Sequence, residues 1–208
     1  MDRDRRFWEE RQCFLPPPSA LLKGMEMIDA AGDRLLAGEL EEAEQLLLWC
    51  DHPEIANYVN LVQGPTQPDV HRFRTVPNAP PTERIRTRMP SATAQKALFA
   101  RDGYRCRFCG LKVVLRAAVK RLDLEFPAAI RWSGPQSQQH PAFRASCASA
   151  DHLVPHSRGG SNEPDNLVTA CGPCQFGRNQ WLISEVGLND PRSRPPVIDG
   201  WDGLSRLL

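Results

Sequence analysis

Four of the seven cysteines in this chain of 208 residues form two Cys-x-x-Cys pairs, Cys106 with Cys109 and Cys171 with Cys174. Two thiolates at this spacing can hold one side of a tetrahedral zinc ion, and a second pair completes its shell. A redox disulfide is the alternative for such a pair, but no βαβ pattern of the thioredoxin type surrounds either one. The cysteines therefore predict a structural zinc site whose four protein ligands leave no open position for chemistry.

A second group of residues whose side chains could take part in a reaction lies between the two cysteine pairs. Asp151 and His152 are adjacent, Gly159 and Gly160 allow a turn, and Asn166 follows 14 residues after the histidine. Alternation around residues 150–154 predicts one strand, residues 166–169 predict a returning strand, and a helix is expected from about residue 171 to 185. A hairpin followed by a helix would bring these side chains and the first helical turn together.

Each of these side chains suits one part of a hydrolytic reaction. His152 has the intrinsic pKa needed to take a proton from water near neutral pH. The Asn166 side-chain carbonyl could accept from the other imidazole nitrogen and select the tautomer, or the residue could simply form a turn. Asp151 offers a hard oxygen to a divalent cation, most simply Mg²⁺ or Mn²⁺, unless it caps the hairpin.

In order and spacing, these elements resemble the HNH endonucleases, a family with a ββα-metal active site. They are Cys-x-x-Cys, Asp-His-x-x-Pro-x-x-x-Gly-Gly, Asn-Leu-Val and a second Cys-x-x-Cys, spread over about residues 91–185. The resemblance implies a metal-dependent nuclease that hydrolyses phosphodiester bonds in DNA, with His152 as general base and Asp151 as ligand of the catalytic ion. It also implies 5′-phosphate and 3′-hydroxyl products, and work in restriction, phage defence or mobile-element biology.

One position departs from the family pattern. The second metal ligand, nine residues after the asparagine, is usually His or Asn, whereas this chain has Gln175. The Gln175 amide can bind a cation through one extra methylene, and Asn179, one helical turn on, could assist or replace it. Arg178 between them is expected to contact a phosphate. The departure keeps open a catalytically weakened, zinc-stapled module that binds nucleic acid. A further alternative is a nuclease subunit that the helical unit, acting as an adaptor, delivers to a larger complex.

The elements that must position these residues are expected in the C-terminal part of an α+β chain. Apolar residues at helical spacing predict a small helical unit over residues 1–63, with two to four short antiparallel helices and candidate breaks at Gly32 and Gly38. Residues 64–90 hold six prolines and predict an extended linker. Residues 91–208 are the predicted nuclease domain with a tail that packs back on it. Within this domain Ser91 is expected to cap a helix that runs to Arg101, and residues 102–174 to be loop-rich with short strands.

Composition and charge fit a globular protein, with 41% hydrophobic and 25% charged residues. No apolar run reaches the roughly 18 residues of a membrane span, and the N-terminus lacks the apolar core of a signal peptide, so a cytoplasmic location is expected. Residues 1–81 carry a net charge of −6, whereas residues 82–208 carry +7. The basic part is therefore expected to bind nucleic acid, and the acidic unit to bind a protein partner or a second copy of the chain.

Overall fold

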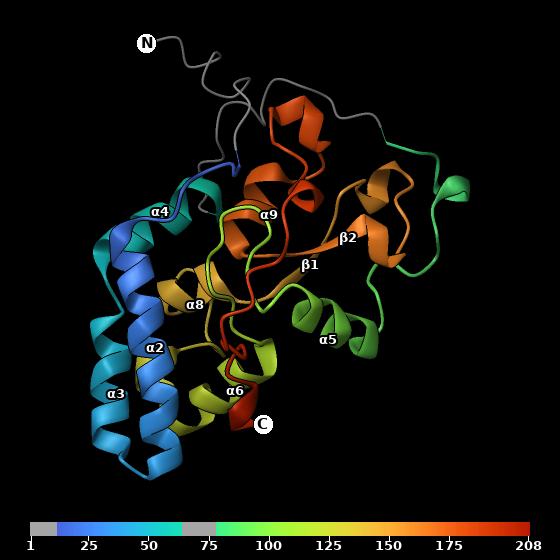
Figure 1. Ribbon diagram of the computed structural model, residues 1–208. Helices are drawn as coiled ribbons and strands as arrows, with labels where there is room; N and C mark the ends of the chain where they lie inside the picture. The colour runs from blue at the N-terminus through green and yellow to red at the C-terminus, as the bar shows by residue number, and fades with distance from the viewer. Residues whose placement is uncertain (1–11, 64–77) are drawn as a thin grey trace, which may run out of the picture.

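The computed structural model describes residues 12–63 and 78–208, and its architecture is mixed α+β, with many short helices and a two-stranded sheet (Figure 1). The helices are α2 (Ser19–Ala37), α3 (Leu40–Trp49), α4 (Pro53–Gln63), α5 (Ala92–Arg101), α6 (Arg116–Glu125), α7 (Pro127–Ile130), α8 (Pro141–Ser146) and α9 (Gly172–Arg178). The strands are β1 (Ser149–His152) and β2 (Leu167–Ala170). Within the described ranges, no helix combines the length and the apolarity that crossing a bilayer requires.

The three N-terminal helices lie within the predicted helical unit. Helix α2 ends at Gly38, which adopts a φ of +79° that favours glycine, and the predicted break there is confirmed. A break at Gly32 was equally expected from the sequence, but this residue lies inside α2. Its hydrogen faces Leu204, and a Cβ built at Gly32 would stand only 2.9 Å from a Leu204 methyl group. Gly32 therefore allows a close approach of the C-terminal tail and does not end the helix.

The predicted cap of α5 is confirmed, because the Ser91 hydroxyl accepts from the Ala94 amide at 3.2 Å. The expectation of a loop-rich segment with short strands over residues 102–174 is wrong in part. Three short helices, α6, α7 and α8, lie there, and two of them begin with a proline at a first-turn position. Buried Ala118, Val119 and Leu122 on one side of α6 show the helical spacing that identifies this segment.

The hairpin that carries the Asp-His pair is present as predicted. Strands β1 and β2 are antiparallel, with Asp151 opposite Val168 and His152 opposite Leu167. The helix expected over residues 171–185 is shorter, because α9 ends at Arg178 and Asn179 leaves it with a φ of +54°. A separate 3-10 turn over Ile183–Val186 follows.

The N-terminal helices share one hydrophobic core with the C-terminal part of the chain. Buried Leu21, Ile28 and Leu47 belong to the same cluster as Phe143 and Leu204. The predicted return of the tail is confirmed, since Trp201 and Leu204 are buried. The division into a unit over 1–63, a linker over 64–90 and a domain over 91–208 stays a prediction; residues 1–11 and 64–77 of it lie outside the described residues.

Candidate active site and metal centre

The four paired cysteines come together as the sequence predicts. Cys106 and Cys109 lie on a tight turn that Gly110 completes with a φ of +79°, while Cys171 and Cys174 lie at the start of α9. All four sulfur atoms lie within 4.8 Å of one another, and those of Cys109 and Cys171 are 3.6 Å apart. Tetrahedral Zn–S bonds of about 2.3 Å need sulfur atoms roughly 3.8 Å apart. The cluster thus fits a zinc ion by both its chemistry and its spacing.

The cysteine cluster also determines where α9 lies relative to the hairpin. The Arg107 amide, between the first two cysteines, donates to the Thr169 carbonyl of β2 at 2.9 Å, and the Cys106 amide donates to the Leu111 carbonyl at 2.9 Å. Cys171 follows directly after β2 and is the N-cap residue of α9. A metal ion bound to the four sulfurs would therefore fasten the turn, the strand and the helix to one another.

His152 lies at the end of β1, with 7% of its surface exposed. Its Nε2 atom is 2.7 Å from Oδ1 of Asn162, and Nδ2 of the same amide donates to the Thr87 carbonyl at 2.8 Å. Because the amide donates through its nitrogen to Thr87, its oxygen must accept, so Nε2 of His152 carries the hydrogen. The lone pair of the neutral imidazole is then on Nδ1.

The Nδ1 atom of His152 remains open. It makes no hydrogen bond within the described residues. The buried polar side-chain atoms that lack a partner there are Arg144 Nε, Ser146 Oγ and Arg194 Nε, and Nδ1 is not among them. The basic nitrogen of His152 is therefore not among the fully buried, unpartnered atoms, although His152 as a whole is only 7% exposed.

Asn166 does not make the hydrogen bond to His152 that the sequence predicts; Asn162 makes it instead. The Asn166 amide binds the loop backbone, accepting from Val154 N at 2.8 Å and donating to the carbonyls of Val154 (3.1 Å) and Ser161 (2.8 Å). Gly160 permits this compact loop, because a Cβ there would lie 1.7 Å from the Val154 carbonyl oxygen. Asn166 thus shapes the loop that presents Asn162.

Asp151 and Arg178 form a buried ion pair beneath the hairpin. The Arg178 guanidinium is 2.6 Å (Nη2) and 3.2 Å (Nε) from the two carboxylate oxygens, and both side chains are almost fully buried. Burial raises the pKa of Asp151, and the positive charge of Arg178 opposes that rise. Arg178 also donates to the carbonyls of His152 and Trp181, both at 2.6 Å. The expected phosphate contact of Arg178 is therefore not supported, because its guanidinium is buried and engaged within the protein.

The residues predicted to hold Mg²⁺ or Mn²⁺ do not form a cation site in this arrangement. Both oxygens of Asp151 accept hydrogen bonds from Arg178, and a cation would have to displace that buried guanidinium from its counter-charge. Gln175 is half-buried on α9, whereas Asn179 lies beyond the helix end and is not on its face as expected. Over residues 12–63 and 78–208, the four cysteines are the single cluster of three or more His, Cys, Asp or Glu residues placed to hold a metal ion.

Two residues near His152 have roles that the sequence did not indicate. Asn162 stands four residues before Asn166, and both fit the same hairpin loop, so spacing alone cannot decide between them. The His156 ring lies with its centroid 6.5 Å from that of His152, and its Nε2 atom is 2.8 Å from the Ile85 carbonyl oxygen. The His156–Ile85 and Asn162–Thr87 hydrogen bonds connect the hairpin loop to residues before α5.

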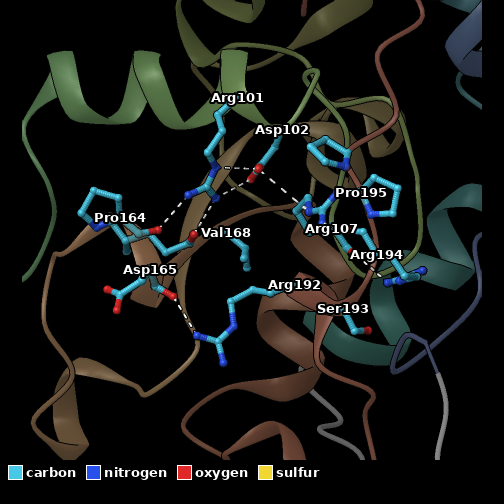
Figure 2. Close-up of a pocket in the computed structure, with 12 residues that line it drawn as sticks. Arg101, Asp102, Arg107, Pro164, Asp165, Val168, Arg192, Ser193, Arg194 and Pro195 are labelled. Atoms are coloured by element: carbon cyan, nitrogen blue, oxygen red, sulfur yellow. Dashed lines mark hydrogen bonds and ion pairs between the residues drawn. The ribbon is translucent and has the colours of Figure 1, made fainter.

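An arginine-rich pocket of about 330 Å³ lies between the end of α5, the start of β2 and residues 192–196 (Figure 2). Arg101 donates to the carbonyls of Pro164 and Leu167, both at 2.7 Å, and Arg192 donates to the Asp165 carbonyl at 3.2 Å. None of the predicted catalytic or metal-binding residues lines this pocket. Its arginines hold the start of β2 in place, and the candidate active site lies elsewhere.

Comparison with known proteins agrees with the site geometry over a limited part of the chain. No curated protein and no solved structure matches it. A family model described as HNH endonuclease matches residues 138–175, a segment that contains both strands, His152, Asn162, Asn166 and the second cysteine pair. Such a match indicates nuclease activity in general and action on nucleic acid. Over residues 138–175 the chain is therefore similar to the HNH endonuclease family model.

Proposed function

We propose that this protein is an endonuclease that hydrolyses phosphodiester bonds in DNA, with His152 as its general base. The observation that carries the proposal is the Nε2–Asn162 hydrogen bond, which leaves the basic Nδ1 atom of His152 open within the HNH segment. A neutral imidazole with one nitrogen held and the other accessible is suited to take a proton from water.

In the proposed reaction, a water oxygen attacks phosphorus while Nδ1 of His152 takes a proton from that water. The new P–O bond forms as the bond from phosphorus to the 3′ oxygen breaks, which leaves a 5′-phosphate. The departing 3′ oxygen takes a proton from solvent and becomes a hydroxyl. Asn162 positions the base and keeps its tautomer. No step is assigned to the predicted Mg²⁺ or Mn²⁺, because Asp151 is bound to Arg178.

The test is cleavage of plasmid DNA by the full chain with and without Mg²⁺ or Mn²⁺, comparing the wild type with His152→Ala. Loss of a general base is expected to slow cleavage by about 100-fold or more. His52→Ala is the matched control, because His52 is exposed before α4. Equal cleavage by the wild type and His152→Ala, or no cleavage of any nucleic acid by the wild type, would contradict the proposal.

A second candidate function is a zinc-stapled module that binds nucleic acid without cutting it. The Asp151–Arg178 pair supports it, since this pair occupies the carboxylate on which cation binding depends, and Gln175 adds to this support. This candidate predicts that the wild type and His152→Ala bind DNA equally and that neither cleaves it with any divalent cation. The same cleavage experiment, combined with a binding measurement, separates the two functions.

A further inference from the structure

We infer that residues 79–88, here called the strap, belong to the nucleic-acid-binding surface, with Arg86 and Arg88 contacting backbone phosphates beside His152. The inference rests on the proposed function and extends it to a segment outside residues 138–175. Figure 1 shows the strap, in green, running beside the loop between β1 and β2 before the chain enters α5.

Three hydrogen bonds hold the strap on the hairpin loop. The Ala79 amide donates to the Ser157 carbonyl at 2.9 Å, and His156 Nε2 donates to the Ile85 carbonyl at 2.8 Å. Asn162 Nδ2 donates to the Thr87 carbonyl at 2.8 Å, and the oxygen of the same amide binds His152. The backbone of the strap is thus two hydrogen bonds away from the imidazole of the proposed base.

Packing supports the same placement. Gly159 in the hairpin loop has a φ of +85°, and a Cβ built on it would meet Ala79 at 3.8 Å and the Glu83 carbonyl at 4.0 Å. The loop and the strap therefore approach closely along several residues. After Arg88 the chain continues into buried Pro90 and the capping residue Ser91. The strap is therefore fixed at its start by Ala79 and just beyond its end by Pro90.

The charges on the strap are available to a ligand. Arg86 and Arg88 are exposed, and neither makes a hydrogen bond or an ion pair within the described residues. Several other arginines among the described residues are engaged, as Arg178 is with Asp151 and Arg206 with Asp29. Arg86 and Arg88 flank Thr87, whose carbonyl is fixed to Asn162. Two exposed arginines on either side of the residue that binds Asn162 suit a polyanion, because guanidinium binds phosphate in a bidentate manner.

The test measures binding separately from cleavage. Full-length His152→Ala protein is titrated against a fluorescent DNA duplex of about 20 base pairs, by anisotropy, over a range of salt concentrations. In that background, Arg86→Gln/Arg88→Gln is expected to weaken binding by about 10- to 100-fold at roughly 100 mM salt. Loss of two phosphate contacts should also lower the slope of log affinity against log salt by about 1.8.

The matched control is Lys23→Gln/Lys120→Gln, which removes the same charge from exposed positions on α2 and α6, away from the strap (Figure 1). It is expected to change affinity by less than about threefold. Arg86→Lys/Arg88→Lys should retain most of the salt slope, and equal zinc content in all variants shows that the fold is intact.

Equal losses in the strap variant and the control would overturn the inference, because net charge alone would then explain binding. Unchanged binding by the strap variant, with tight binding by the parent, would overturn the strap inference and leave the proposed function standing. No DNA binding by the parent would overturn both.

Discussion

At the scale of single residues, the tautomer of His152 depends on a neutral amide. Asn162 can serve because its nitrogen is already committed to the Thr87 carbonyl, which forces its oxygen toward the ring. The sequence was sufficient to identify the Asp-His pair and the two Cys-x-x-Cys pairs as candidate functional residues. The partner of His152 could not, because Asn162 and Asn166 occupy one loop and only side-chain conformation distinguishes them.

Replacing Asn162 with alanine is expected to release the imidazole from one tautomer while leaving the hairpin folded. The ¹⁵N NMR signals of the His152 ring should then show a mixture of Nε2–H and Nδ1–H forms, where the wild type shows Nε2–H. Cleavage is expected to fall by about 10- to 100-fold because the basic nitrogen is no longer held in place. An unchanged tautomer in Asn162→Ala would remove Asn162 from its positioning role.

The Asp151–Arg178 pair makes a prediction about stability and about the cation together. Arg178→Met leaves a buried carboxylate without its partner and should lower the free energy of unfolding by about 3–5 kcal/mol. If Asp151 can hold a divalent cation once Arg178 is absent, Mg²⁺ or Mn²⁺ should raise the melting temperature of Arg178→Met more than that of the wild type. Thermal unfolding with and without each ion measures this, and Arg178→Met/Asp151→Asn is the control that should not respond.

At the scale of elements, the hairpin, the cysteine turn and α9 are held together by backbone hydrogen bonds and by the four clustered cysteines. The two strands were predicted within two residues of their observed limits, because alternation and the glycine pair mark them clearly. The end of α9 was missed by several residues, since Asn179 takes a left-handed conformation that helical periodicity does not reveal. Helices α7 and α8 were missed because both are short and start at prolines, whereas the helical spacing of Ala118, Val119 and Leu122 in the longer α6 was overlooked.

Cys106→Ser is expected to abolish stoichiometric zinc binding and to unfold the elements that the cysteines join. Cys50→Ser is the matched control, because Cys50 is also buried but its thiol binds the carbonyls of Gly24 and Leu46, away from the cluster. Zinc content by atomic emission and circular dichroism before and after a chelator measure the effect. Retention of zinc and of the native spectrum by Cys106→Ser would remove the zinc assignment.

At the scale of the whole molecule, the acidic and basic halves of the chain meet each other. Lys112 pairs with Asp29 at 3.1 Å, Arg206 pairs with the same carboxylate at 2.6 Å, and Arg131 pairs with Asp51 at 2.5 Å. The sequence predicted separate partners for the two halves from their opposite net charges. Net charge cannot show which faces come into contact, and part of this asymmetry is satisfied within the molecule.

The seam between α2 and the C-terminal tail can be tested with two glycines of one helix. Gly32→Ala should destabilise the protein by about 1–3 kcal/mol, because its Cβ would overlap the Leu204 side chain at 2.9 Å. Gly24→Ala is the control, since its Cβ would meet Ile55 at an ordinary 3.6 Å and should stabilise α2 by up to about 1 kcal/mol. Urea unfolding of both variants measures the sign of each change in the free energy of unfolding. Equal changes in the two variants would mean that the tail does not pack tightly against α2.

The link from Thr87 through Asn162 to His152 limits how freely this candidate site can be transferred to another protein. A shortened protein that begins at α5 would keep every residue of the HNH-like motif. It would lack the Thr87 carbonyl, which turns the Asn162 amide oxygen toward the His152 ring. Grafting the motif alone into another scaffold would thus carry the proposed general base without the upstream residue that sets its tautomer.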